Sequence, residues 1–325
     1  MKTDTGIKII DYIRQKQKVR PDDLIREFNL SRTAIHKQLK KLVEQGKLRK
    51  IGKPPKVFYQ LATKVLPKKG HSFDLKQEKI INQNYLIITP SGERLEGVEG
   101  FVYWCDKTNQ PLSQTVKDYV STLTKYQRYR RHGLINGMSK LRQTFDKVWL
   151  DKLYYLDFYS LERFGKTKLG QLLLYAKQSQ DKKLIEELVI GIKQQIKKVI
   201  VDNKISGVGF IPPTVKRQVQ LMKELQKKLH LGLREVKISK IKTSVIVPQK
   251  TLAKLGDRIE NAKQTIIVEE KGKFDNILLI DDAVGSGSTL NETAGQIRAK
   301  KLVKGKIVGL AITGSFKGFD IISEV

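Results

Sequence analysis

The chain of 325 residues contains only one cysteine, Cys105. A single cysteine excludes an internal disulfide, and no metal-binding side chains cluster near it, so we expect no direct zinc site. No hydrophobic run is long enough to predict a membrane-spanning helix. Residues 1–20 are polar and charged, unlike a secretory signal. A cytoplasmic protein without a membrane partner is the simplest interpretation.

Acidic residues are also scarce relative to basic ones. The sequence has 63 lysines and arginines against 33 aspartates and glutamates, which gives a net charge of +30. Such a balance favours a polyanionic partner, of which nucleic acid is the usual example. The alternative is a lysine-rich, solvated surface without such a partner. The length allows two or three domains, each with its own core.

Residues 5–62 follow a pattern of three helices and a hairpin. Ile9 and Ile13 lie at helical spacing, and Pro21 suits the first turn of a second helix. Ser31 is a favourable N-cap for a third helix, which Gly46 ends. The expected elements are helices at 5–16, 21–28 and 32–45, followed by strands at 48–51 and 57–61.

The order and spacing of these elements resemble the winged helix-turn-helix family, an α+β fold. The resemblance implies double-stranded DNA as a partner, with the third helix in its major groove. Residues 1–70 hold 19 basic and 6 acidic residues, so their net charge of +13 favours DNA over use for protein contact alone. The candidate DNA-binding residues are Arg32, Thr33, His36 and Lys37 at base edges, and Lys40, Lys53 and Lys56 at phosphates or the minor groove.

The middle of the chain carries weaker signals. Residues 85–88 favour a strand and 112–126 a helix, and the basic stretch 125–132 fits either nucleic-acid contact or a solvated helix face. We expect a mostly helical connector that could also form a homodimer. The expected domains are 1–66 (winged helix-turn-helix), 67–150 (connector) and 151–325 (α/β domain).

The remaining sequence alternates between strand and helix patterns. Such alternation predicts an α/β domain with a mostly parallel sheet. The expected strands are 208–211, 265–268, 277–280 and 307–312, and the expected helices are 169–176, 184–200, 215–229 and 290–302.

The most informative stretch joins an aliphatic run to two acids and a loop. Residues 277–280 are aliphatic, Asp281 and Asp282 follow, and glycines and hydroxyls lead to Thr289. Ligands bind at the carboxyl ends of parallel strands, where loop amides and a helix N-terminus can hold a phosphate. Two carboxylates beside a phosphate cradle suit a sugar phosphate, because they accept hydrogen bonds from its hydroxyls.

This stretch resembles the 5-phosphoribosyl 1-pyrophosphate (PRPP) motif of type I phosphoribosyltransferases, although Gly285 stands where threonine is more frequent. Further blocks at 211–217, 248–252 and 258–262 are similar to the ComF-like members of that family. The resemblance implies the type I phosphoribosyltransferase fold for the C-terminal domain. ComF-like proteins often carry an N-terminal four-cysteine zinc module, which this chain lacks.

By that resemblance, Asp281 and Asp282 would face the ribose hydroxyls and, in an enzyme, be catalytic. Lys216 and Arg217 would lie near the pyrophosphate, and Arg258 would contact pyrophosphate or make a structural ion pair. Residues 235–262 would form a flexible hood, and Mg²⁺ would accompany PRPP. The full set of expected PRPP-binding residues is Asp281, Asp282, Ala283, Val284, Gly285, Ser286, Gly287, Ser288, Thr289, Lys216, Arg217 and Arg258.

Three functions fit this combination. The first is a DNA-binding transcription regulator with PRPP as its effector, a plan similar to the purine repressors of Gram-positive bacteria. The second is an active phosphoribosyltransferase in nucleobase salvage, which would close the hood over its site. The third is a ComF-like role in DNA uptake or recombination.

Overall fold

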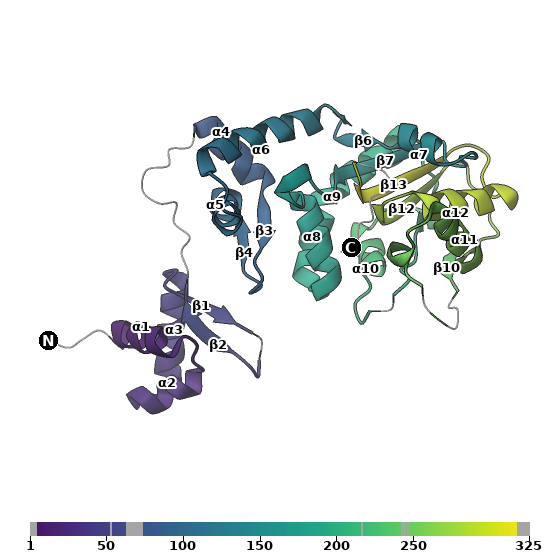
Figure 1. Cartoon of the computed structure of the whole chain (residues 1–325). Coiled ribbons are helices and arrows are strands. Elements are labelled where there is room, and N and C mark those ends of the chain that lie inside the picture. Colours follow the sequence, from purple (N-terminus) through teal and green to yellow (C-terminus); the bar gives the residue numbers. More distant parts are fainter. Residues whose placement is uncertain are drawn as a thin grey trace. The chain divides into compact units, whose positions relative to one another are not determined.

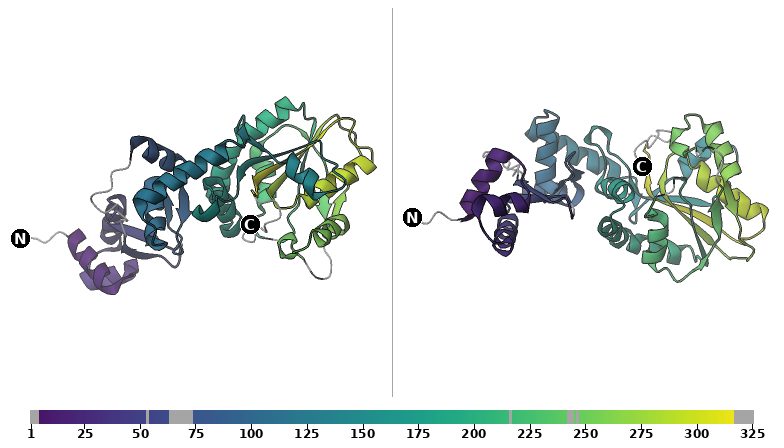
Figure 2. Two further views of the ribbon diagram at one scale, coloured as in Figure 1. Left: turned by 45° about the horizontal axis from the view of Figure 1, so that its top comes forward. Right: turned by 90° about the horizontal axis from the view of Figure 1, so that it is seen from below.

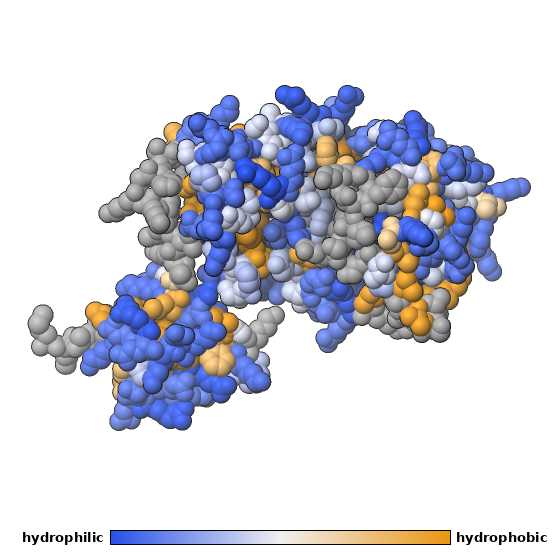
Figure 3. All heavy atoms as spheres, viewed as in Figure 1, coloured by the Kyte–Doolittle hydropathy of each residue, from blue (hydrophilic) through white to orange (hydrophobic). Residues whose placement is uncertain are grey.

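The computed structural model describes residues 5–52, 54–62, 74–215, 217–241, 245 and 247–316. The chain forms two compact units, residues 1–68 and 69–325 (Figure 1). In the described stretches, no helix has the length and hydrophobicity needed to cross a membrane. Most of the described surface seen in Figure 3 is hydrophilic, as the high content of charged residues requires.

The N-terminal unit has the elements that its sequence predicts. The three helices surround a core in which Ile9, Leu24 and Ile35 are fully buried. The Ser31 hydroxyl accepts a hydrogen bond from the backbone N–H of Ala34, as an N-cap should. These elements are α1 (Thr5–Lys16), α2 (Pro21–Phe28), α3 (Arg32–Glu44), and the antiparallel strands β1 (Leu48–Ile51) and β2 (Phe58–Leu61).

The first half of the second unit mixes helices with short strands. Tyr85, Phe101 and Tyr119 form an aromatic cluster, with ring centroids 5.0–5.5 Å apart, that is continuous with the core of the large sheet. The elements are α4 (Leu75–Asn84), β3 (Leu86–Ile88), β4 (Arg94–Glu96), α5 (Gly97–Lys107), α6 (Leu112–Gln127), β5 (Arg130–Arg131), β6 (Leu134–Asn136) and α7 (Met138–Thr144).

The second half of this unit alternates between strands and helices. Its elements are β7 (Lys152–Phe158), α8 (Lys168–Ser179), α9 (Lys182–Asp202), β8 (Gly207–Phe210), α10 (Leu221–Leu229), β9 (Arg234–Glu235), β10 (Ile238–Lys240), α11 (Leu255–Thr265), β11 (Ile266–Val268), β12 (Ile277–Val284), α12 (Ser288–Ala299) and β13 (Ile307–Gly314), with 3-10 turns η1 (Glu162–Phe164) and η2 (Gln249–Thr251).

A seven-stranded sheet forms the centre of this unit, in the order β5-β6-β7-β13-β12-β8-β9. Figure 2 shows the unit in two further views. The strands from β7 to β9 in that order are parallel, and β5 and β6 are antiparallel additions. Leu279 of β12 lies opposite Gly209 of β8 and Gly309 of β13. The predicted mostly parallel α/β sheet is therefore confirmed, and its carboxyl ends meet at one edge.

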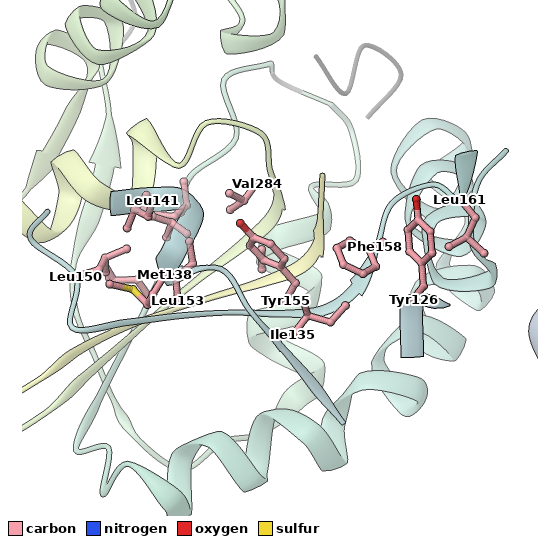
Figure 4. Packing of buried hydrophobic residues seen from close by; sticks show 14 of the residues in the cluster. Tyr126, Ile135, Met138, Leu141, Leu150, Leu153, Tyr155, Phe158, Leu161 and Val284 are labelled. Carbon is pink, nitrogen blue, oxygen red and sulfur yellow. The ribbon is translucent and has the colours of Figure 1, made fainter. Parts of the chain in front are cut away.

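Helices cover both faces of the sheet. Helices α8, α9 and α10 pack their leucines against one face, which includes Leu278 and Leu310. On the other face, α7 and α12 pack against Leu153 and Leu279. Figure 4 shows Leu141 of α7 beside Val284, and Met138 of the same helix next to Leu153, in this second cluster. Burial on both faces explains why β12 and β13 read as continuous aliphatic runs.

Candidate functional site

One candidate site is the exposed face of α3. Arg32, Thr33, His36, Lys37 and Lys40 are all exposed, because the face that carries Ile35 and Leu39 turns into the core. Lys56 is also exposed, in the connection between β1 and β2, whereas Lys53 lies outside the described residues. The structure thus brings five of the expected DNA contacts onto one helix.

Two of these cations have acidic neighbours. Arg32 and Asp22 form an ion pair of 3.0 Å, with 72% and 61% of their side chains exposed. Lys40 and Glu44 approach to 3.9 Å, one turn apart on α3. Exposed ion pairs contribute only about 0–1 kcal/mol. Both cations can therefore exchange these carboxylates for DNA phosphates at little cost.

The second candidate site is a pocket at the carboxyl edge of the parallel strands. Its cavity has a volume of about 210 Å³. The loop from β12 to α12, the segment after β8, and residues from α8, β10, η2 and α11 contribute to its walls. All described members of the expected PRPP set line it: Asp281, Asp282, Ala283, Val284, Gly285, Ser286, Gly287, Ser288, Thr289, Arg217 and Arg258. Lys216 lies outside the described residues.

The loop after β12 has the geometry of an anion cradle. Gly287 has a φ of +87°, and a Cβ there would lie 2.6 Å from Cδ1 of Leu141. Glycine is therefore needed for both conformation and space. The buried Ser288 hydroxyl lies 3.0 Å from that of Ser286, and α12 begins at Ser288. The loop amides and the helix N-terminus provide partial positive charge for an anion.

The two aspartates lie in different electrostatic environments. The Asp282 carboxylate forms a 2.5 Å ion pair with Nζ of Lys177, at the end of α8. Burial and then the charge of Asp282 raise the pKa of the Asp281 carboxyl well above its ordinary value. Lys240 of β10 attracts Asp281 electrostatically, while burial lowers the pKa of the lysine. Nζ of Lys240 also donates to the Thr214 hydroxyl at 2.7 Å.

The two arginines of the pocket already have backbone partners. Nη1 of Arg217 donates to the carbonyl of Lys177 at 2.7 Å and to Oε1 of Gln178 at 3.0 Å. The buried Arg258 donates from Nε to the Leu252 carbonyl at 2.7 Å. Burial lowers the pKa of Arg258. These hydrogen bonds fix the orientation of both guanidinium groups in the pocket wall.

Sequence reasoning missed two lysines and misplaced one helix. Lys177 and Lys240 line the pocket, yet neither was among the expected PRPP-binding residues. The helix expected from residue 215 begins only at Leu221, so its predicted start was wrong. Before it, the backbone N–H of Val219 donates to Oε1 of Gln180 at 2.8 Å. This hydrogen bond holds the residues before Leu221 against the end of α8. They therefore form part of the pocket wall and not the first turn of α10.

Comparison with known families assigns the N-terminal unit. A family model described as winged helix-turn-helix DNA-binding matches residues 2–49. That range covers α1, α2, α3 and the start of β1. A search of curated proteins found no similar sequence. The protein therefore combines a winged helix-turn-helix unit with an α/β unit built on a mostly parallel seven-stranded sheet.

Proposed function

We propose that the protein is a DNA-binding transcription regulator whose α/β unit binds PRPP as its effector. The winged helix-turn-helix unit, with its exposed row of cations on α3, is the observation that carries the regulatory part. A DNA-binding unit joined to a unit with a small-molecule pocket is the layout of a ligand-responsive regulator.

The chemistry of the pocket supports a phosphorylated sugar as the effector. The cradle around Gly287 suits a 5′-phosphate, and Asp281 and Asp282 suit vicinal hydroxyls. Arg217 and Arg258 offer guanidinium groups to a second phosphate group. PRPP carries these groups together. A C-terminal type I phosphoribosyltransferase fold of the ComF-like kind remains part of this proposal.

The first experiment measures binding of the full chain to DNA from its own promoter region by fluorescence anisotropy, with and without PRPP. We expect PRPP to change the affinity, and we expect Asp281→Asn with Asp282→Asn to abolish that change while sparing DNA binding. Loss of DNA binding in the folded double variant would contradict this assignment. DNA binding indifferent to PRPP would favour the alternative enzyme, to be assayed by pyrophosphate release with a panel of nucleobases.

The DNA face is tested separately through salt dependence. Lys37→Ala or Lys40→Ala should weaken binding to all sequences and reduce the slope of log affinity against log salt by about 0.9 for each lost phosphate contact. Lys197→Ala, an exposed lysine on α9, is the matched control and should leave the slope unchanged. An unchanged slope in the α3 variants would rule out this face.

A homodimer is an optional part of the same proposal. A two-fold dimer would place its α3 helices about 34 Å apart, to read half-sites one helical turn apart. Light scattering of the protein with and without promoter DNA measures its oligomeric state. A monomer bound to a single half-site would remove the dimer from the proposal.

A further inference from the structure

The resemblance to PRPP sites implies magnesium, but the donors in this pocket do not suit a metal ion on the acid pair. In the described part of the chain, no group of three or more His, Cys, Asp or Glu side chains could hold a metal. Asp281 and Asp282 are the only carboxylates among the described residues that line the pocket. Each of them already has a lysine nearby.

We propose that Lys177 and Lys240 replace a divalent cation in this pocket, so that it binds a diphosphate-bearing sugar phosphate as the free anion. The inference rests on the proposed function. It specifies that PRPP binds without magnesium, whereas the resemblance implies a magnesium complex. It assigns to Lys177 the role of a positioning residue and countercharge for Asp282.

The pair of Lys177 and Asp282 is the stronger observation. The two side chains are only 18% and 14% exposed, and Nζ lies 2.5 Å from Oδ2. An ion pair of this burial is costly to break, because one partner would leave the other charged and desolvated. The carbonyl of Lys177 accepts a hydrogen bond from Arg217, which fixes the end of α8 against the pocket wall. A metal ion would have to displace this ammonium group to reach Asp282.

Lys240 supplies a second cation that attracts Asp281, from another element of the fold. It lies at the end of β10, which pairs with β11. Its Nζ is held by the Thr214 hydroxyl, in the segment after β8, and it interacts electrostatically with Asp281. Asp281 is therefore attracted by both Lys177 and Lys240, whereas Asp282 forms its ion pair with Lys177.

The charge of the pocket suits a bare polyanion. Its described lining includes four cationic side chains, Lys177, Arg217, Lys240 and Arg258, and two carboxylates, a formal balance of +2. An anionic ligand meets an attractive field without a metal ion. A magnesium ion in the pocket would instead be repelled by the positive charges of Lys177 and Lys240. Solvent and salt screen this repulsion poorly in a half-buried site.

The test is isothermal titration of PRPP into the full chain, in excess EDTA and in millimolar magnesium. We expect the wild-type dissociation constant to differ by less than about threefold between the two conditions. In EDTA, Lys177→Met should weaken binding by at least about tenfold, the effect of losing a charged hydrogen-bonding partner. Magnesium should restore part of that loss, because the ion can then approach Asp282.

Two further variants separate countercharge from structure. Lys177→Arg keeps the cation and should keep binding independent of magnesium. Lys152→Met is the matched control, since Lys152 is a half-buried lysine on β7 that donates to Asn203 at the other end of the strands. It should change neither affinity nor metal dependence. If Lys177→Met does not fold, Lys240→Met supplies the same comparison at Asp281.

The outcomes distinguish this inference from the proposed function. Wild-type binding of PRPP only in the presence of magnesium would overturn the inference and leave the effector assignment intact. Equal affinities of wild type and Lys177→Met in EDTA would also overturn it. Absence of PRPP binding in both conditions would overturn the effector assignment, and this inference with it.

Discussion

Asp281 should reduce the stability of the free protein at neutral and alkaline pH. Its carboxyl lies in the wall of the pocket beside Asp282, and desolvation and then the charge of Asp282 raise its pKa from 3.8 to about 7 despite the attraction of Lys177 and Lys240. Between these two values the folded chain holds a proton that the unfolded chain releases. Stability therefore falls as the pH rises from about 4 to about 7, and the full penalty is present above that range.

The size of this penalty follows from the shift. One pKa unit corresponds to about 1.4 kcal/mol, so Asp281 lowers the free energy of unfolding, relative to acid pH, by about 4 kcal/mol at pH 8 and about 2 kcal/mol at pH 5. Asp281→Asn removes the titrating group at nearly constant shape. Relative to wild type, Asp281→Asn should be stabilised by roughly 2–3 kcal/mol more at pH 8 than at pH 5. For a unit of this size, that is a further rise in melting temperature of about 5–10 °C.

Thermal melts of wild type and Asp281→Asn at pH 5 and pH 8, without ligand, measure this difference. Asp202→Asn, at the exposed end of α9, is the matched control for the replacement of an aspartate outside the pocket. An equal stabilisation by Asp281→Asn at both pH values would refute the reasoning, because it would mean that Asp281 titrates as in an unfolded chain. The same variant should lose PRPP affinity, since the stability cost accompanies the binding role.

Two more predictions concern single positions. Gly287→Ala should lower stability by about 1–3 kcal/mol and weaken PRPP binding, because Gly287 has a positive φ and a Cβ there would contact Leu141. Gly191→Ala is the control, since a Cβ at that position of α9 meets open space. It should be neutral or stabilising in the same melts. Burial raises the pKa of Cys105 to about 12, so the native thiol should react with a thiol reagent at pH 8 far more slowly than the unfolded chain. Rapid labelling of the native protein would contradict the burial of α5.

The sequence predicted best those elements whose capping residues and hydrophobic spacing indicate the same bounds as the buried residues of the structure. Helices α1 and α2 have the predicted bounds, because helical spacing of isoleucines and a proline at the first turn act within a few residues. Strand β12 extends to Val284, beyond the aliphatic run that ends at residue 280. Asp281 and Asp282 continue the strand into the wall of the pocket. Polar residues there still pair with β13, so the end of the aliphatic run does not mark the end of the strand.

The candidate site was predictable only where one segment holds all the chemistry. The continuous segment from Asp281 to Thr289 lines the pocket, so its sequence motif was enough to predict these residues together. Lys177 and Lys240 reach the same pocket from α8 and β10, 104 and 41 residues before Asp281 in the numbering of the chain. Each is an ordinary lysine in a lysine-rich sequence, and only the three-dimensional arrangement pairs them with the aspartates.

Helix α8 offers a physical route by which the pocket could affect the first half of the second unit. At one end it carries the pair of Lys177 with Asp282, and near its other end Lys168 forms a 3.2 Å ion pair with Glu96 of β4. An effector that competes with Lys177 for Asp282 weakens the ion pair at one end of this helix. The opposite end of the helix contacts β4 through Lys168 and Glu96. Lys168→Met should therefore leave PRPP affinity nearly unchanged and reduce the effect of PRPP on DNA affinity. Anisotropy titrations with and without PRPP measure both quantities, and an undiminished effect would show that coupling does not pass through this contact.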